Sequence, residues 1–534
     1  FFEYFDYIII AAKDSTALMD ILSIDRLEVL ENFSHYEIRE FGHKKRFELV
    51  CKWAEIGGAH DESSAKWMST IDKWEKDLTT AVGRQFVPAV PIFLLTLLQS
   101  IEAGRTADLQ NSAFGHYYQF LITSALQEIG VEREQWAEVF NYCSHLAWFF
   151  HSSEERHISE SVFRSFTQKF SEEFTPVPYE RRLRDLIKAN ILAQVEGQIE
   201  FKYSYLYFYF IGQYIADHLH EPQMDAVVTE LCRDLHLRDN ANILLFSCHH
   251  TKSPLIYERI AEALDACFDN ERLFDFEKDV ALLNSLVNAA PSLVYNERSV
   301  RESRSSEREQ QDLAEDSRME SEAAESTNAG ITKLFRSMEI LGQFLKNHYG
   351  TTRNPTKDAL IKKVLDGSLR GLFGLTNSFI NHTDSLLEHV GREAEKKGES
   401  GDEKIAHAKR VIFDLMGLIT FAFVNKASSA VGSAYLRDNL FNVVEGRGNL
   451  GYDLIAMSYQ MDLPEPIPFQ KLKSLNASVE NNVFSRALLR SLALKHLHLF
   501  KVGYQDKQRL CEELDISLNK QSALQHSRNR SHVK

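Results

Sequence analysis

The apolar positions between Phe201 and Leu219 follow two different periods. Aromatic side chains occupy every second position from Phe201 to Tyr207, which is the period of a β-strand. From about Phe208 the apolar residues recur every three or four positions, which is the period of a helix. The stretch therefore predicts a strand that runs directly into a helix.

The sequence before this junction predicts a helix and a β-hairpin. Residues 182–190 have a helical pattern, and two extended pieces, 191–195 and 199–203, flank Gly197. A glycine between two short extended pieces is typical of a tight hairpin turn. Helix, hairpin, aromatic junction and helix is the order in which a winged-helix domain ends. An aromatic-rich stretch alone would indicate only a buried core.

The first fifty residues alternate between strand and helix patterns. Residues 5–12 are an apolar run rich in β-branched side chains, which is typical of a strand buried on both faces of a parallel sheet. Lys13 follows this strand, at the end where open α/β sheets bind their ligands. A second strand-like piece at 36–38 leads into a helix that reaches Trp53. We expect the tail of an α/β domain, most of which lies before Phe1.

Two helical patterns follow, and a proline opens the second. Trp67, Ile71 and Trp74 are spaced to lie on one face of a helix. Pro91 stands at the first turn of an apolar helix, where the missing N–H of proline costs little. The apolar run 86–98 is shorter than the roughly twenty residues that a membrane-spanning helix needs. We therefore expect no membrane span.

The second half of the chain has helical patterns separated by polar turns. Residues 301–330 are dense in charge and serine and nearly lack large apolar side chains, which predicts a flexible linker or at most an exposed helix. Strong helical patterns follow at 331–347, 357–364, 406–424, 440–459 and 483–500. No repeat of constant length is present. We expect paired antiparallel helices in a solenoid-like array over 224–508.

Composition narrows the class of protein. The 534 residues predict several domains, and the few prolines and glycines fit a mainly α protein. With 61 basic and 76 acidic residues the net charge is −15, which argues against an indiscriminate nucleic-acid binder and favours protein or nucleotide partners. Six cysteines without paired spacing fit a reducing compartment, so we expect a cytoplasmic location.

The sequence contains no recognisable catalytic motif. It has no G-x-x-x-x-G-K-[ST] loop to hold phosphates, and no Ser, Cys or His has the setting of a nucleophile. Cys248, His249 and His250 are adjacent, so they cannot all face one ion from a regular helix or strand, and no C-x-x-C accompanies them. We therefore predict no catalytic residue, no metal ligand and no catalysis by this chain alone.

The order of these pieces resembles the STAND NTPases, most closely the NACHT-like ATPases of bacterial defence systems, over roughly residues 1–219. In that family the winged helix ends in a Phe-x-His-x-x-Phe segment that leads into an aromatic helix. Phe201 matches the first position, whereas Tyr203 stands in place of the histidine. The resemblance implies a fold that is mainly α, with the tail of an α/β P-loop ATPase core, a helical lid, a winged helix and a helical array.

The resemblance assigns three residues to a nucleotide. Lys13 takes the place of a sensor near the terminal phosphate, and Pro91 takes the place of a lid proline beside the adenine, with Pro88 as the competing candidate. Tyr203 takes the place of the histidine that touches the ADP phosphate in many relatives. A phenol donates a hydrogen bond but carries no positive charge at neutral pH, so Lys202 is the alternative phosphate contact.

The resemblance also implies a division of the chain into six parts. These are the end of the ATPase core at 1–55, a helical lid at 56–110, a winged-helix-containing domain at 111–219, a helical region at 220–300, a flexible charged linker at 301–330 and a helical sensor region at 331–534.

The function implied is the regulatory and sensing half of a signalling ATPase. ATP or ADP, with Mg in the intact protein, holds such proteins closed; recognition of a phage protein opens them, and the subunits oligomerise to activate an amino-terminal effector. One alternative is a helical protein-interaction scaffold without nucleotide. Another is a DNA-binding winged helix that uses one basic helix face, consisting of Arg181, Arg182, Arg184 and Lys188. A P-loop upstream in the intact gene would separate the first from both alternatives.

Overall fold

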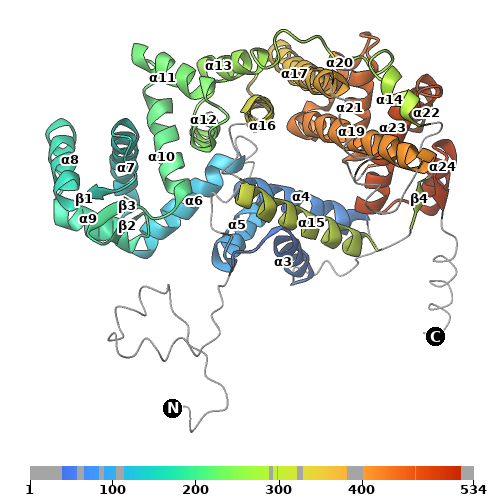
Figure 1. Ribbon diagram of the computed structural model, residues 1–534. Helices are drawn as coiled ribbons and strands as arrows, with labels where there is room; N and C mark the ends of the chain where they lie inside the picture. The colour runs from blue at the N-terminus through green and yellow to red at the C-terminus, as the bar shows by residue number, and fades with distance from the viewer. Residues whose placement is uncertain are drawn as a thin grey trace, which may run out of the picture. The chain divides into compact units, whose positions relative to one another are not determined.

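The protein is mainly helical, which confirms the mainly α prediction. The computed structural model describes residues 39–56, 65–82, 89–103, 113–287, 293–296, 299–321, 329–381, 392, 401–463 and 465–518. Contacts divide the chain into two units, Phe1–Phe41 and Gly42–Lys534. The helices and strands described all belong to the second unit (Figure 1). The strands predicted at 5–12 and 36–38 lie outside the described residues.

Four helices come first within the second unit. They are α3 (His43–Ile56), α4 (Ala65–Val82), α5 (Pro91–Ala103) and α6 (Ala113–Glu128). α4 packs against each of the other three. Trp67, Ile71 and Trp74 are all buried on α4, which confirms the face predicted from their spacing. Pro91 is the first residue of α5, as its position in the sequence predicts.

A three-stranded antiparallel sheet follows. The elements of this region are η2 (Arg133–Gln135), α7 (Trp136–Ser152), β1 (Ile158–Ser159), α8 (Glu160–Glu173), α9 (Tyr179–Lys188), β2 (Leu192–Val195), β3 (Gln198–Phe201) and α10 (Ser204–Asp217). β3 is the central strand, in the order β1-β3-β2. Between β2 and β3, Glu196 and Gly197 have φ values of 51° and 78°, the left-handed turn that suits a two-residue hairpin. The predicted hairpin at Gly197 is confirmed.

The helix after the hairpin begins earlier than the sequence predicts. Phe201 ends β3 and α10 begins at Ser204, so the aromatic positions Tyr205 and Tyr207 are helical rather than part of a strand. Every residue from Tyr205 to Gly212 is buried, because α10 packs against both α7 and α12 (Arg238–His250). A helix that is apolar on all sides shows no 3.6-residue stripe, and its alternating tyrosines therefore imitate a strand.

Gly212 sets the distance between α10 and α12. A Cβ atom at this position would lie 2.8 Å from the carbonyl carbon of Phe246 and from the amide nitrogen of Ser247, both in the backbone of α12. The absence of a side chain therefore allows the two helices to approach to backbone contact. The first turns of these two closely packed helices line the same cavity, which is described below.

The remaining elements are mostly helices. They are α11 (Pro222–Arg233), α13 (Pro254–Asp265), α14 (Ala281–Leu286), β4 (Val294–Tyr295), α15 (Val300–Ser321), α16 (Ala329–Asn347), α17 (Asn354–Asn381), α19 (Gly401–Val431), η4 (Ala434–Leu436), α20 (Arg437–Val444), α21 (Leu450–Met461), α22 (Phe469–Ser478), α23 (Val483–Leu499), α24 (Tyr504–Glu513) and β5 (Ser517–Leu518). The single helix predicted at 440–459 is two helices, because Gly446 and Gly448 have positive φ values between them. β4 and β5 pair in parallel.

One described helix passes the length and composition test for a membrane span. It is Glu403–Val431 within α19. This helix packs against α16, α17, α21 and α23, and a core helix enclosed by neighbours passes the same test. The stretch is therefore weak support for a membrane span.

The charged stretch predicted as a flexible linker or an exposed helix forms α15 over 300–321, and one of its side chains is deeply buried. Arg304 is 1% exposed. Its guanidinium donates to Asp72 at 2.9 Å, to Glu75 at 3.1 Å and to the carbonyl of Leu499 at 2.8 Å. The composition of the stretch hides this contact, because the partners of Arg304 are distant in sequence. A buried arginine is held stably only when its donors are satisfied in this way.

Further contacts join α15 to α3. Asp312 accepts hydrogen bonds from the backbone N–H of His43 at 2.5 Å and of Lys44 at 3.1 Å. It therefore caps the amino terminus of α3 and places a negative charge at the positive end of that helix. The pKa of Asp72 is lowered: burial acts to raise it, but Lys76 and Arg304 outweigh burial.

The buried network generates the first prediction. Replacing Arg304 with methionine removes the cation that Asp72 and Glu75 share. Lys76 and Arg308 remain beside these carboxylates. We therefore expect the free energy of unfolding to fall by about 3 kcal/mol in urea titrations. Arg301→Met removes a half-exposed pair with Glu55 on the same helix, and it is expected to cost at most about 1 kcal/mol. Equal losses in the two variants would contradict the buried role of Arg304.

A second pair of variants tests the close contact of α10 and α12. Gly212→Ala is expected to lower the free energy of unfolding by about 1–3 kcal/mol, because its Cβ meets rigid backbone. Gly417 lies within α19 with nothing within 4 Å of an added Cβ, so Gly417→Ala should stabilise the protein by about 0.5–1 kcal/mol. Thermal or urea unfolding measures both, and a stabilising Gly212→Ala would refute the close packing.

Candidate functional site

Tyr203 contacts the helix that Pro91 opens. Tyr203 is the extended residue that precedes α10, and its ring meets the ring of Phe93 edge-on with centroids 5.4 Å apart. Phe93 lies in the first turn of α5, two residues after the exposed Pro91. The structure therefore brings Tyr203 to the first turn of α5. Lys13 and Pro88 lie outside the described residues.

The electrostatic character of Tyr203 is that of a neutral donor. Burial raises the pKa of its phenol, so the group keeps its proton at neutral pH. The Nζ of Lys202 lies 5.6 Å from the ring centroid and donates a hydrogen bond to the Asn190 side chain. Tyr203 and Lys202 together present one phenol and one ammonium at the start of α10.

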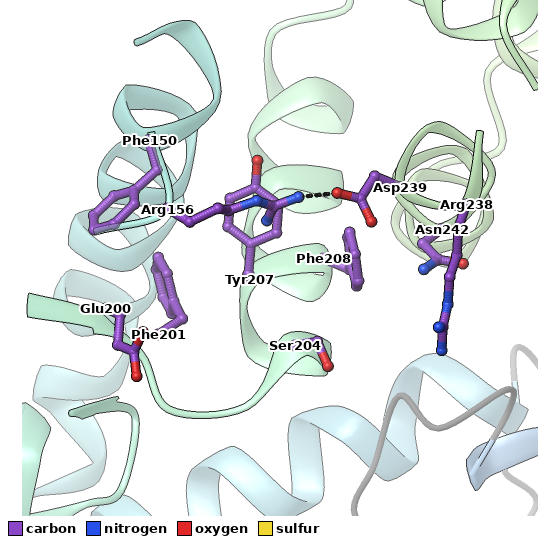
Figure 2. Close-up of a pocket in the computed structure, with 10 residues that line it drawn as sticks. All are labelled: Phe150, Arg156, Glu200, Phe201, Ser204, Tyr207, Phe208, Arg238, Asp239 and Asn242. Carbon is purple, nitrogen blue, oxygen red and sulfur yellow. Dashed lines mark hydrogen bonds and ion pairs between the residues drawn. The ribbon is translucent and has the colours of Figure 1, made fainter. Parts of the chain in front are cut away.

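A cavity of about 440 Å³ lies beside this junction. It is bordered by the end of α7 and the turn after it, by β3, and by the first turns of α10 and α12 (Figure 2). The lining residues are Phe150, Arg156, Glu200, Phe201, Ser204, Tyr207, Phe208, Arg238, Asp239 and Asn242. The wall is thus part aromatic and part charged, which suits a small ligand with an apolar and a polar part.

Arg156 crosses the cavity wall from the turn after α7. Its guanidinium lies 3.8 Å from the ring centroid of Tyr207 and forms an ion pair with Asp239 at the start of α12 (Figure 2). Burial raises the pKa of Tyr207 to about 12, although the positive charge of Arg156 opposes this shift. Next to Arg156, His157 contacts Glu200 with an Nδ1–Oε2 distance of 2.7 Å. The two acidic side chains of the cavity therefore each have a basic neighbour.

Two helices begin at this cavity without a side-chain cap. The residues before them, Tyr203 for α10 and Leu237 for α12, make no capping hydrogen bond with their side chains. Ser204 and Arg238 are the first residues of these helices and both line the cavity. The positive ends of two helix dipoles therefore face one space.

Cys248, His249 and His250 serve helix packing. Asn347 donates to Nδ1 of His249 at 2.8 Å, and Nε2 of His250 donates to the carbonyl of Tyr209 at 3.1 Å. Among the residues that the structure describes, no group of three or more His, Cys, Asp or Glu side chains is arranged to hold a metal ion. The three adjacent residues thus tie α12 to α16 and α10.

The basic face of α9 is largely neutralised within the protein. Arg182 forms an ion pair with Glu138 and lies 5.4 Å from the ring centroid of Tyr142. Arg181 and Arg184 both face Asp185 on the same helix. These pairs reduce the positive charge that α9 offers to a nucleic-acid phosphate backbone.

The sequence did not predict Arg156, Asp239 or Asn242 as site residues. Arg156 and Asp239 are 83 positions apart, and neither belongs to a local motif. Only the packing of α10 against α7 and α12 brings them together. The one signal available in the sequence was the run of aromatic residues on α10, which supplies part of the wall.

Comparison with known proteins gives one family match. Residues 156–211 match the family model described as Novel STAND NTPase 4, and this match supports a STAND NTPase family. The matched segment runs from Arg156 to Ile211 and so contains β1–β3, most of α10 and six of the ten residues that line the cavity. No curated protein and no solved structure matches the chain.

The buried histidines predict a loss of stability in acid. Burial lowers the pKa of His249 to about 3 and of His250 to about 4, whereas both titrate near 6.5 when unfolded. The unfolded chain therefore binds more protons below pH 6.5, and the free energy of unfolding should fall as the pH drops from 7 towards 4. His249→Gln keeps an acceptor for Asn347 and removes one protonating group. Urea unfolding at pH 7 and pH 5 should therefore show a smaller loss of the free energy of unfolding in this variant than in the wild type. An unchanged loss would contradict this assignment.

Proposed function

We propose that this chain is the regulatory and sensing part of a STAND signalling NTPase. The family match at 156–211 is the observation that carries the proposal. In the proposed mechanism a bound nucleotide stabilises a closed state, and a trigger protein stabilises an open one. The ratio of the two states is then set by the difference in binding free energy of each ligand for each state.

The matched segment supports a winged helix within this scheme. β1, the two helices α8 and α9, and the hairpin β2–β3 follow one another, with β3 between β1 and β2 in the sheet. This order of strands and helices agrees with the winged-helix domain proposed for 111–219. The helices α4 and α5 lie within the lid proposed at 56–110. The end of an ATPase core is proposed for 1–55, and α3 lies at the end of that part.

The contact between Tyr203 and Phe93 supports a nucleotide site shared by the lid and the winged helix. In the proposal Pro91 packs by the adenine, Tyr203 donates its phenol hydrogen to a phosphate oxygen, and Lys13 contacts the terminal phosphate. A neutral phenol binds a phosphate more weakly than a charged histidine does. The closed state should therefore depend more on the rest of the site than it does where a histidine is present.

The same proposal names partners and a location. ATP or ADP, with Mg in the intact protein, is the nucleotide, and a P-loop is proposed upstream of Phe1. The helical region 331–534, proposed as a solenoid-like array, would recognise a foreign protein such as one from a phage, after which subunits oligomerise and activate an amino-terminal effector. A cytoplasmic location agrees with six cysteines that are all free and buried.

The alternative is a helical interaction scaffold without nucleotide. It is favoured by the extent of helix–helix packing beyond α10 and by the absence of a P-loop in this chain. The two proposals differ in one measurable property, which is whether the intact protein carries a nucleotide.

Nucleotide content of the intact protein, purified natively, tests the proposal. We expect bound ADP or ATP in the wild type, detected by chromatography of the denatured protein. Lys13→Ala, Pro91→Ala and Tyr203→Phe should each lower the nucleotide content, because each removes a proposed contact. The loss in Tyr203→Phe should be the smallest, since a single neutral hydrogen bond contributes about 1 kcal/mol.

Pro222→Ala is the matched control, because Pro222 opens α11 in the same way that Pro91 opens α5. Its nucleotide content should equal that of the wild type. A wild-type protein without any nucleotide would exclude the switch and leave the scaffold as the better proposal.

A further inference from the structure

Asn242 is a buried amide that faces the cavity. The residue is 6% exposed, and its side chain lines the cavity from the first turns of α12 (Figure 2). Within the described part of the chain no hydrogen bond from this amide to another residue is formed. A polar group that makes no hydrogen bond within the protein and lines a cavity is available to a ligand.

The surroundings of Asn242 favour a ligand that carries a negative charge. The uncapped first turns of α10 and α12 and the guanidinium of Arg156 border the same cavity. Arg156 has five N–H donors, and its ion pair with Asp239 uses one nitrogen. Both members of this pair are about half exposed, so the pair is weak and an incoming oxyanion can compete with it.

The size and wall of the cavity define the rest of the ligand. A volume of about 440 Å³ falls in the range of small-molecule sites and exceeds what one inorganic anion fills. Phe201, Tyr207 and Phe208 supply an apolar wall. The two arginines are balanced by Glu200 and Asp239, which disfavours a highly charged ligand such as a triphosphate.

We propose that this cavity binds a small organic phosphate, with its oxygens at Arg156, Ser204 and Asn242 and its apolar part against the aromatic wall. The site is distinct from the nucleotide contact proposed at Tyr203 and does not depend on it. Because the ligand replaces the pair between Arg156 and Asp239, its binding changes the link between the turn after α7 and the start of α12.

Titration calorimetry of the full chain with phenyl phosphate tests this site. We expect saturable binding, weaker binding of inorganic phosphate, which lacks a ring, and no binding of benzyl alcohol, which lacks the oxyanion. Equal affinity for inorganic phosphate would overturn the organic part of the assignment. Equal affinity for benzyl alcohol would overturn the phosphate part.

Two variants test whether phenyl phosphate binds in this cavity. Asn242→Leu removes the amide while nearly keeping the volume, and Arg156→Gln removes the charge; each should weaken phenyl phosphate binding about tenfold or more. Asn242→Leu should unfold at the same temperature as the wild type or higher, because no protein hydrogen bond is lost. A structural role for the amide would instead lower that temperature.

Arg233→Gln is the control, because Arg233 is an exposed arginine at the end of α11 with two acidic neighbours, outside the cavity. It should bind phenyl phosphate as the wild type does. No saturable binding to the wild type, or unchanged binding in both cavity variants, would overturn the proposal. Nucleotide content in the two cavity variants should stay at the wild-type level; its loss would place the cavity within the nucleotide site and refute the claim of a separate ligand.

Discussion

The guanidinium of Arg304 joins three parts of the chain that are far apart in sequence. It extends from α15 to two carboxylates on α4 and to the last carbonyl of α23. A cation of this size is stable in the protein interior only while all of these acceptors are in place. The position of α15 therefore depends on both neighbours at once, because this one side chain contacts an early helix and a late helix of the unit together.

The sequence predicted elements well wherever one face of an element is polar. The tryptophan-bearing face of α4 is clear from spacing alone, because burial on one side produces a period. The hairpin at Gly197 is clear from the glycine between two short extended pieces. The start of α10 was placed too late, since a helix buried on every side has no such period. α15 was interpreted from its composition, which does not reveal the remote carboxylates that hold Arg304.

The residues of the candidate site also differ in whether the sequence alone could predict them. Tyr203 could be singled out because it stands at the histidine position of the motif in the family that the sequence resembles, and the structure places its ring against Phe93. Arg156, Asp239 and Asn242 could not, because they become neighbours only when α12 packs against α10. Gly212, which allows that packing, is indistinguishable in the sequence from any other helical glycine.

The parallel pairing of β4 with β5 has a consequence for the order in which the chain folds. Tyr295, in β4, also donates a hydrogen bond to the carbonyl of Leu497, which is 202 residues away along the chain. During synthesis on the ribosome, Tyr295 emerges long before Leu497, so this hydrogen bond forms only after most of the remaining chain has been made. Contacts of such long sequence separation form late and slowly, because a large loop must close before they are made. The closure of β4 on β5 is therefore expected to follow the formation of the helices between them.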